Sequence, residues 1–461
     1  MKKIVIIGGG LGGLYSALKL SETSKYDITI LDSSAQFGGS YGSYTYEDGA
    51  LFDYGIHVIY EAMNEDVDKT LRDIIPTSEW NFLVGNKKDI AGTYYKGKLQ
   101  EYSHYIDIRS QESQIHQKAI GSFFNNIENE KIEATNVYEY LTNRFGKYIT
   151  DTIHEDVLQK LYSDNGKNLH LMVSKIVPLE RVILYSEEFV KDLMGSSYIR
   201  NKIAYPDQLN FDESLKSKQR GLYPKQFGMQ GYVNRIVDLL KKRGVKLISS
   251  VQIENINKSE DKINSIEYIH DDRTDTIDNI SHLHWAIPEE SVARFFDFNI
   301  SEKDKPKHLY YIHLYTNQKP KMGKLYYFYI LDKGFSSFRI SSYYNYCTDA
   351  KTNDGLYPIC MEMHFDKEQD KKSLFIQAKK ELLSLNLVDK DDNIVYINTP
   401  SKSSVFPVPT LKNTKITKDA DNHIQSLGIK NMTYTGVCPE KELFFLHDIL
   451  LENFNQIKDL L

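Results

Sequence analysis

KIVIIGGGLGGLYSALKLSETSKYDITILD, residues 3–32, contains the strongest structural signal in the sequence. An apolar run, Lys3–Ile7, leads into a glycine turn, and an amphipathic stretch follows the turn. A second apolar run, Ile28–Leu31, ends at Asp32. This order predicts a strand, a turn, a helix and a second strand, which together form a unit that binds a dinucleotide.

Three glycines of the turn, Gly8, Gly10 and Gly13, follow the spacing G-x-G-x-x-G. Gly8 permits a tight turn, Gly10 lets the backbone approach a pyrophosphate, and Gly13 lets the helix pack close to the strand. Free N–H groups at the helix start, together with the helix dipole, favour anionic phosphates. Asp32 is placed to accept hydrogen bonds from a ribose. The alternative is a tight strand–helix turn that binds no ligand.

Composition excludes several classes of function. The net charge of −6 is small and the lysines are scattered, so a nucleic-acid-binding surface is not indicated. The three cysteines (Cys347, Cys360 and Cys438) lack C-x-x-C spacing, so no metal site is predicted, and a reducing cytoplasm fits best. No apolar run reaches the roughly 18 residues of a membrane-spanning helix. The first apolar run is interrupted at Gly8, too early for a signal peptide.

The length of 461 residues exceeds one average domain and predicts two or three interleaved units. Residues 105–205 are expected to be largely helical, and residues 292–400 are rich in strand patterns. Further expected elements are a helix at 65–75, a hairpin around Lys96-Gly97, a loop at Tyr223-Pro224 and 228–231, a helix at Tyr232–Lys242, a strand at Val245–Val251, paired strands at 260–287, an extended segment at 406–413, a short strand that reaches Gly436 and a final amphipathic helix.

Tyrosine is unusually abundant, at 33 residues. Aromatic residues suit β-strands, so packing on sheets is the first interpretation. The alternative is a pocket lined with phenol groups that bind a polar, hydroxyl-rich substrate. The cluster Tyr326, Tyr327 and Tyr329 favours the second interpretation locally.

Four blocks follow one another along the chain: IIGGGLGGLYSALKL (6–20) with Asp32 and Gly38-Gly39, FDYGIHVIY (52–60), YPKQFGMQGYVNRIVDLLKKRGVKLISSVQI (223–253) and YTGVCPEKELFFLHDIL (434–450). In this order they resemble the flavoprotein superfamily that includes amine oxidases, protoporphyrinogen oxidase, phytoene desaturases and UDP-galactopyranose mutase. Three positions depart from the pattern. Asp32 stands where glutamate is usual, Ser40 where arginine or lysine is frequent, and Gly436-Val437 where the mutases carry Gly-Arg. The last difference argues against galactopyranose mutase activity itself.

The resemblance implies an α/β fold, with a Rossmann-like FAD-binding domain built on a parallel sheet. This domain is interleaved with a substrate domain that combines a mixed β-sheet and helices. The expected FAD-binding parts are 1–95, 216–290 and 406–461. The expected helical cap is 96–215, and the expected substrate-domain sheet is 291–405.

The resemblance also implies FAD as the cofactor. The sequence leaves its mode of attachment open, and we expect binding without a covalent bond. Cys438 or His57 could supply a covalent link as the alternative. A helix that begins near Leu443 would point its N-terminus at the flavin pyrimidine edge. The implied FAD contacts are Gly8, Gly10, Leu11, Gly12, Gly13, Asp32, Ser33, Gly39, Ser40, Ile56, His57, Val251 (through its backbone), Gly436, Phe444 and Phe445.

His57, Arg339 and Tyr344 are the candidates for catalysis. A histidine near the flavin ring can donate, accept or hold a proton, although it could also be a packing residue. The planar fork of Arg339 suits a carboxylate or diphosphate, and its alternative is a salt bridge on an exposed strand. Tyr344 follows closely with Tyr343 and Tyr346, and strand alternation would turn some of these inward.

Three functions remain open at this point. The first is an FAD-dependent oxidoreductase that acts on a small polar molecule, in surface polysaccharide or secondary metabolism. The second is a non-redox flavoenzyme that resembles UDP-galactopyranose mutase and acts on a nucleotide sugar. The third is a flavin-binding protein without catalysis, which the chain length argues against. The sequence does not indicate an oligomeric state.

Overall fold

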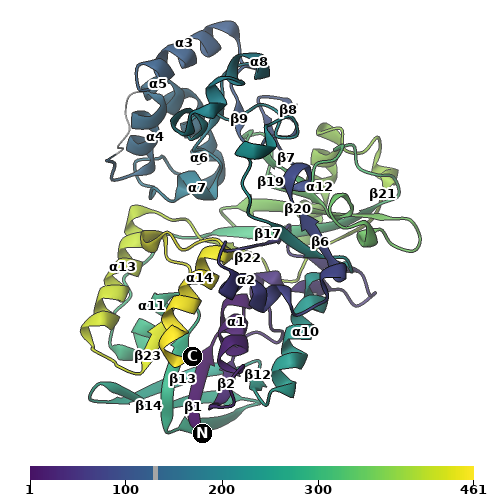
Figure 1. Cartoon of the computed structure of the whole chain (residues 1–461). Helices are drawn as coiled ribbons and strands as arrows, with labels where there is room; N and C mark the ends of the chain where they lie inside the picture. Colours follow the sequence, from purple (N-terminus) through teal and green to yellow (C-terminus); the bar gives the residue numbers. More distant parts are fainter. Residues whose placement is uncertain (128–132) are drawn as a thin grey trace. The chain divides into compact units, whose positions relative to one another are not determined.

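The computed structural model describes residues 1–127 and 133–461, in two compact units (Figure 1). Unit 1 comprises residues 1–81, 219–303 and 413–461, and unit 2 comprises residues 82–218 and 304–412. The chain therefore passes between the units after residues 81, 218, 303 and 412. The sequence predicts these passages after residues 95, 215, 290 and 405. Each unit is described by itself below.

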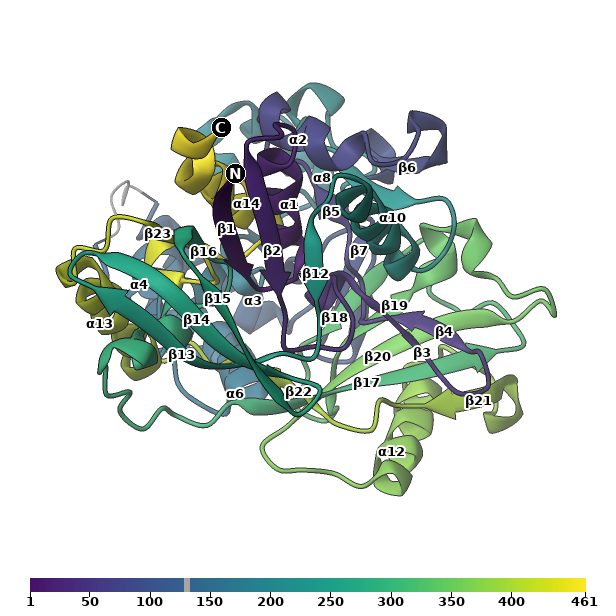
Figure 2. The ribbon, with the colours of Figure 1, turned by 90° about the horizontal axis from the view of Figure 1, so that it is seen from below.

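Unit 1 is built on a parallel sheet with the strand order β12-β2-β1-β16-β23 (Figure 2). The central strand β1 is almost completely buried from Ile4 to Ile7. Burial on both faces explains why its sequence is a continuous apolar run rather than an alternating one. The strand bounds are β1 Lys2–Ile7, β2 Tyr26–Leu31, β12 Lys246–Ile248, β16 Ile280–Trp285 and β23 Met432–Tyr434.

Helices and small sheets complete unit 1. Strands β3 and β4 pair, β11 lies between β5 and β6, and β13, β14 and β15 form an antiparallel sheet. The bounds are α1 Leu11–Leu20, α2 Glu65–Arg72, α10 Met229–Lys242, α11 Glu289–Ala293, α13 Leu411–Ser426, α14 Leu446–Ile457, β3 Ser43–Thr45, β4 Leu51–Asp53, β5 Ile59–Tyr60, β6 Trp80–Leu83, β11 Gly221–Pro224, β13 Gln252–Ser259, β14 Lys262–His270 and β15 Arg273–Asp278. Helix α13 and strand β6 continue across a unit boundary.

Two expectations for the segment that leads into α10 are wrong at the residue level. Tyr223-Pro224 lies in strand β11 rather than in a loop, because the pairing of Gly221 and Leu222 with β5 holds this segment extended. Helix α10 begins at Met229 rather than Tyr232, so Gly231 lies inside it. The helix can start early because the Asp53 carboxylate accepts the free N–H of Met229 at 2.9 Å.

Unit 2 contains the mixed sheet that the resemblance implies, in the order β21-β17-β20-β19-β18-β7-β8, with β22 also paired to β17. Strands β18 and β7 run parallel, and the other neighbours run antiparallel. The bounds are β7 Ala91–Tyr95, β8 Lys98–Gln100, β17 Lys307–Thr316, β18 Tyr327–Ile330, β19 Ser337–Ser342, β20 Tyr357–Phe365, β21 Ile394–Asn398 and β22 Ser404–Phe406.

Helices are the main regular elements of residues 105–205, as expected, and the short pair β9 and β10 and irregular segments lie between them in the described part of this region. Their apolar side chains form a core cluster that also includes Leu309 of β17 and Phe338 of β19. The bounds are α3 Ser113–Phe124, α4 Val137–Phe145, α5 Lys147–Ile149, α6 Glu155–Tyr162, α7 Val173–Ile176, α8 Glu187–Val190, α9 Ser197–Arg200, β9 Ile106–Asp107 and β10 Val182–Ile183.

Helix α12 and the start of helix α13 lie where the sequence analysis expected strands or an extended segment. Helix α12, Lys371–Ser384, interrupts the strand-rich region between β20 and β21. Helix α13 begins at Leu411, so the end of the segment predicted as extended is helical. Pro407 and Pro409 disfavour helical backbone at the residues that precede them. The extended segment therefore reaches Pro409, and the helix starts two residues later.

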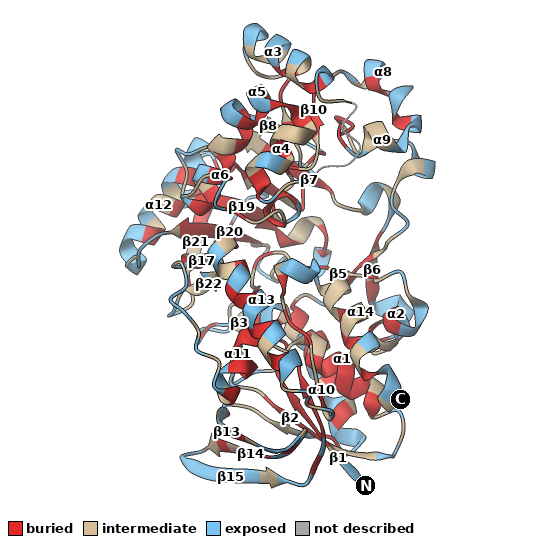
Figure 3. Ribbon diagram, turned by 90° about the vertical axis from the view of Figure 1, so that its left-hand side faces the viewer, coloured by how far each residue is buried: buried red, intermediate tan, exposed pale blue. Residues whose placement is uncertain are grey.

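Burial follows these layers, with β1 and α1 buried and β15 mostly exposed (Figure 3). A core cluster of unit 1 combines residues of β1, β16 and the antiparallel β13–β15 sheet with residues of α11 and α13. Within the described ranges, no helix is both long and apolar enough to cross a bilayer.

Candidate functional site

The glycine turn between β1 and α1 has the geometry that its spacing predicts. Gly8 has φ +106°, and its N–H donates to the Leu31 carbonyl at 2.9 Å. A Cβ at Gly13 would lie 1.9 Å from the Gly8 carbonyl oxygen, so the fold itself requires glycine there. At Gly10, by contrast, no heavy atom of the described residues lies within 4 Å of the Cβ position. Gly10 therefore borders open space at the start of α1.

The start of α1 fits an anionic group. Its N-cap residue is Gly10, and no side chain of the described residues caps the helix. Its first turn reads Leu11, Gly12, Gly13 and Leu14, so it carries no acidic side chain. The free N–H groups and the positive end of the helix dipole thus lie beside the open space at Gly10. This arrangement fits the diphosphate of a dinucleotide.

The second glycine pair lies directly against the turn. The Gly38 N–H donates to the Gly9 carbonyl at 2.8 Å, and Gly38 forms a bridge with Gly10. Gly38 and Gly39 have φ +116° and +58°, and a Cβ at Gly39 would lie 3.3 Å from the Gly10 Cα. The glycine pair therefore marks a close approach of two backbones, and the exposed Ser40 follows it.

Asp32 is fixed at the end of β2 by backbone donors. Its Oδ2 accepts the Gly9 N–H at 2.5 Å, and its Oδ1 accepts the Ser34 N–H at 2.7 Å. Each carboxylate oxygen has a second lone pair for a ribose hydroxyl. The buried Val251 donates its own N–H to the Asp32 carbonyl at 2.9 Å, whereas Ser33 is exposed. Asp32 and Val251 are therefore adjacent, as expected for two residues that would contact the same cofactor.

Asp53 is a buried carboxylate that the sequence analysis did not select. It accepts the hydroxyls of Ser43 and Tyr223, both at 2.5 Å, in addition to the Met229 N–H. Burial is the main cause that raises its pKa, and these three donors oppose the increase. These three hydrogen bonds join the strands β3, β4 and β11 and the helix α10. The sequence feature that could have identified Asp53 is its place as an acid at the end of the run ALFD, just before Tyr-Gly.

His57 lies in the segment that follows Asp53 in the chain. The histidine is half-buried, as is Ile56, and its ring centroid lies 5.1 Å from that of Tyr41 in an edge arrangement. Burial raises the pKa of the Tyr41 phenol, so Tyr41 stays protonated near neutral pH. The Tyr41 ring thus lies against the His57 ring.

The C-terminal part of unit 1 contains another glycine without room for a side chain. A Cβ at Gly436 would lie 2.5 Å from the Pro288 nitrogen, and Gly436 is buried. Phe444 and Phe445 follow, with ring centroids 5.3 Å apart. Helix α14 begins at Leu446 rather than near Leu443, because the backbones of Leu443 and Cys438 pair as an antiparallel bridge. Phe444 and Phe445 therefore precede the helix.

Arg339 in unit 2 is paired with Glu362. Its Nε and Nη2 donate to the Glu362 Oε1 and Oε2 at 2.6 and 2.8 Å. The two residues are cross-strand partners on β19 and β20, and Tyr329 is the partner of Arg339 on β18. The guanidinium also lies 5.8 Å from the Tyr327 ring centroid. The fork expected to bind an anion therefore already holds a carboxylate of the same sheet, and the pair lies largely buried rather than on an exposed strand.

Tyr344 follows β19 in a short 3₁₀ turn and is half-buried, whereas Tyr343 and Tyr346 are buried. Its ring packs edge-on against Tyr357 with centroids 5.1 Å apart, and the Lys319 ammonium lies 5.5 Å from its centroid. Tyr344 and Arg339 belong to unit 2, whereas His57 and the predicted FAD contacts belong to unit 1.

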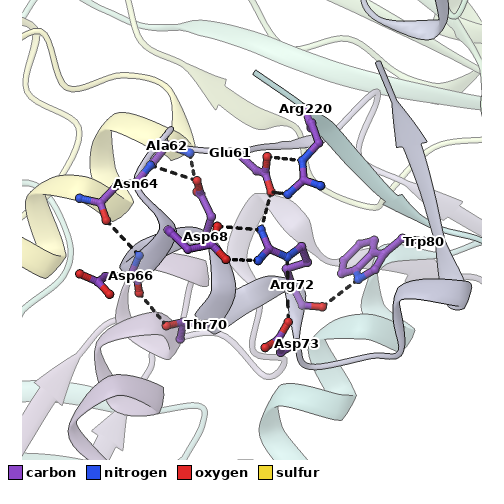
Figure 4. A network of polar contacts seen from close by, with 11 residues as sticks. Glu61, Ala62, Asn64, Asp66, Asp68, Thr70, Arg72, Asp73, Trp80 and Arg220 are labelled. Atoms are coloured by element: carbon purple, nitrogen blue, oxygen red, sulfur yellow. Dashed lines mark hydrogen bonds and ion pairs between the residues drawn. The ribbon is translucent and has the colours of Figure 1, made fainter. Parts of the chain in front are cut away.

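Glu61 of unit 1 is held by two arginines (Figure 4). Arg72 donates to its Oε1 at 2.9 Å, and the Arg220 Nε donates to its Oε2 at 2.6 Å. The Glu61 side chain is 7% exposed, so two cations compensate one nearly buried carboxylate. Neither arginine was selected from the sequence. Among the described residues, no group of three or more His, Cys, Asp or Glu side chains could hold a metal ion.

Comparisons with known sequences match the glycine turn to a family model. Residues 6–74 match the model described as NAD(P)-binding Rossmann-like domain. The inactive all-trans-retinol 13,14-reductase of Danio rerio is 22% identical over 55% of this chain and 42% of its own length. A 4,4'-diaponeurosporene oxygenase of Staphylococcus aureus is 21% identical over 58% of this chain and 52% of its own length. The chain thus spans about half the length of these relatives.

Solved structures match nearly the whole chain. A reduced UDP-galactopyranose mutase has TM-score 0.74 and 17% identity, covering 98% of this chain and 92% of its own. Putrescine oxidase has TM-score 0.61 and 9% identity, covering 100% and 99%. Cyclohexylamine oxidase of Brevibacterium oxydans has TM-score 0.59 and 10% identity, covering 100% and 98%. The chain therefore has the fold of FAD-binding flavoproteins with a Rossmann-like domain, as its resemblance to that superfamily implies.

Proposed function

We propose that this chain is an FAD-dependent oxidoreductase that acts on a small polar molecule. The observation that carries the proposal is the open space at Gly10 beside the uncapped start of α1, within the fold of FAD-binding flavoproteins. Bound FAD would supply the electron-transfer chemistry. The chain would bind its diphosphate with the backbone of Gly8–Gly13 and Gly39, and its ribose with Asp32.

The side chains of the chain would bind and orient the substrate and manage protons. His57 is the group proposed to hold or move a proton, at whichever ring nitrogen faces the substrate. Arg339 would act together with Glu362 as a fixed dipole on the sheet of unit 2, because its Nε and Nη2 already donate to the Glu362 carboxylate. Tyr344 would offer a hydroxyl donor from the turn after β19.

A second candidate function is a non-redox flavoenzyme that acts on a nucleotide sugar. The mutase structure has a higher TM-score with this chain than either amine oxidase described above. The tyrosines that surround Arg339 suit hydroxyl-rich ligands. The Gly436-Val437 sequence, which replaces Gly-Arg, opposes this candidate. A non-catalytic flavin-binding protein is the third candidate. For the oxidoreductase, we also propose a cytoplasmic location and a role in surface polysaccharide or secondary metabolism.

The first experiment tests the cofactor. We expect the purified protein to be yellow, and its unfolding to release FAD with the free-flavin spectrum. Gly10→Val would fill the space proposed for the diphosphate, where an added Cβ has no described atom within 4 Å, and it should abolish FAD binding in a folded protein. The matched control is Gly231→Val, because Gly231 is exposed in α10 with equally open surroundings. A colourless protein that binds neither FAD nor ADP would contradict the proposal.

The second experiment separates the two catalytic candidates. An oxidoreductase should consume a stoichiometric electron acceptor, such as oxygen, with one member of a panel of amines, alcohols and other polar substrates. A mutase should convert a nucleotide sugar only after dithionite reduction, with no net consumption of the reductant. Turnover of the second kind would replace the first proposal with the second.

A further inference from the structure

A buried chain of hydrogen bonds in unit 1 joins elements that the proposed site does not account for. His284 of β16 is fully buried. Its Nε2 lies 2.8 Å from the Asn453 Oδ1 of α14 and 3.1 Å from the Ser16 Oγ of α1. Its Nδ1 lies 3.0 Å from the Thr433 Oγ1 of β23, which lies 2.9 Å from the His282 Nε2. Every ring nitrogen of His284 therefore has a polar partner.

The partners fix which nitrogen of His284 carries the proton. The Asn453 Nδ2 donates to the Ile449 carbonyl at 2.7 Å, so the oxygen of this amide faces His284. An amide oxygen only accepts, and Nε2 must therefore be the protonated nitrogen. Nδ1 is then an acceptor for the Thr433 hydroxyl. Burial lowers the pKa of His284 to about 4, so the ring stays neutral near pH 7.

The same asparagine also reaches the glycine turn. A Cβ at Gly12 would lie 3.1 Å from the Asn453 Nδ2 and 3.4 Å from the Ile449 Cγ2. Ser16, one turn further along α1, donates to the Asn453 Oδ1 at 3.1 Å. Figure 1 shows α14 beside α1, and their residues are in contact. Helix α14 thus packs on the first turn of α1, the turn proposed to bind the diphosphate.

We propose that Asn453 and His284 are positioning residues for the cofactor: their hydrogen bond fixes the first turn of α1 in the orientation that binds a dinucleotide diphosphate. The inference rests on the proposed FAD site and deepens it. Asn453 can link α14 to both β16 and α1. Its Nδ2 donates to a carbonyl of its own helix, and its Oδ1 accepts hydrogen bonds from His284 of β16 and Ser16 of α1. Loss of the amide would let the first turn shift while the sheet remained intact.

The test compares Asn453→Leu with Leu450→Ala. Leucine keeps the number and branching of the side-chain heavy atoms of asparagine but removes both polar atoms, whereas Leu450 is a buried residue of the same helix outside the network. Dissociation constants are measured below the melting temperature of each variant, for FAD and for ADP, which carries the adenosine and diphosphate of FAD without the riboflavin. We expect Asn453→Leu to weaken both ligands by about tenfold, the ratio that one lost buried hydrogen bond produces. Leu450→Ala should lower the melting temperature and leave both constants unchanged.

A second pair of variants keeps the inference testable if Asn453→Leu does not fold. Thr433→Val removes the hydroxyl that donates to the His284 Nδ1, and Thr433→Ser retains it. We expect weaker ADP binding for the valine variant and recovery for the serine variant. A ¹⁵N spectrum of His284 should show protonation at Nε2 in the wild type.

The outcomes separate the two proposals. A wild-type protein that binds neither FAD nor ADP contradicts the proposed function. A wild-type protein that binds both, with an Asn453→Leu variant of equal affinity, overturns only the positioning role. Equal losses of affinity in Asn453→Leu and Leu450→Ala would likewise assign the effect to the general packing of α14.

Discussion

The glycine turn of unit 1 and the Arg339–Glu362 pair of unit 2 are two different kinds of polar site. The glycine turn presents backbone N–H groups, and its specificity comes from the absence of side chains at Gly8, Gly10 and Gly13. The Arg339–Glu362 pair consists of side chains that come from neighbouring antiparallel strands. The first site depends on local backbone conformation, and the second depends on strand register.

The difference between these sites determines how each one tolerates change. A backbone site fails when any added carbon meets the main chain, because the main chain cannot move aside. A side-chain site fails when one partner is lost, because the other remains charged and buried. The predictions below use this contrast, beginning with the largest expected effect.

Gly13→Ala should have the largest effect. Its Cβ would lie 1.9 Å from the Gly8 carbonyl oxygen, so β1 and α1 would have to separate. We expect a loss of more than about 4 kcal/mol in the free energy of unfolding, or an insoluble protein. Chemical denaturation followed by circular dichroism measures the loss. Gly10→Ala is the control, since its Cβ has open space, and equal stability of the two variants would contradict the described turn.

Arg339→Ala should have the next largest effect. The substitution leaves Glu362 buried without its cation, which we expect to cost about 3–5 kcal/mol of unfolding free energy near neutral pH. Equilibrium denaturation of the variant and the wild type measures the difference. A loss below about 1 kcal/mol would show that the pair is solvated.

The pH dependence of the same variant gives a sharper test. Burial raises the pKa of Glu362, and Arg339 opposes the increase, so removal of Arg339 raises this pKa further. A carboxyl whose pKa is higher in the folded state stabilises the fold below its unfolded pKa of about 4.3. That stability disappears as the pH rises through the folded pKa. The deficit of Arg339→Ala should therefore grow from pH 4 upward, and a deficit independent of pH would contradict this cause.

Arg220→Ala should have the smallest effect of the three. Its partner Glu61 keeps Arg72 at 2.9 Å, and the Arg220 side chain is 37% exposed. We expect a loss of about 1 kcal/mol, because a second cation remains and solvent screens the first. Denaturation side by side with Arg339→Ala provides the comparison. Equal losses would mean that the two arginines of Glu61 do not substitute for one another.

The sequence predicted the parts of the fold whose signals are local. The strand–turn–helix–strand unit at the N-terminus, the helical region at 105–205 and the strand-rich region after residue 292 are present in the structure. Helix α12 was missed because it lies among strands, and the start of α10 was placed late because glycines at 228 and 231 suggested a loop. In the second case, the cap that starts the helix comes from the distant Asp53.

The candidate site shows the same division. Gly8, Gly13 and Gly436 were selected from the sequence, and the structure gives each a backbone reason to be glycine. Asp53 and Asn453 were missed, because most of their hydrogen-bond partners lie more than a hundred residues away in the chain: Tyr223 and Met229 for Asp53, and His284 and Ser16 for Asn453. The roles of His57, Arg339 and Tyr344 remain predictions.

The amino-acid sequence by itself determined the glycine turn and the acid at the end of β2. These features follow from steric limits and periodicities within short segments, which any stretch of chain carries with it. Only the tertiary structure decided that Arg339 meets Glu362, that Asp53 starts α10 and that Asn453 links α14 to the first turn of α1. Side-chain partners depend on which distant segments pack together, and that choice is made by the burial of the whole core rather than by the local sequence.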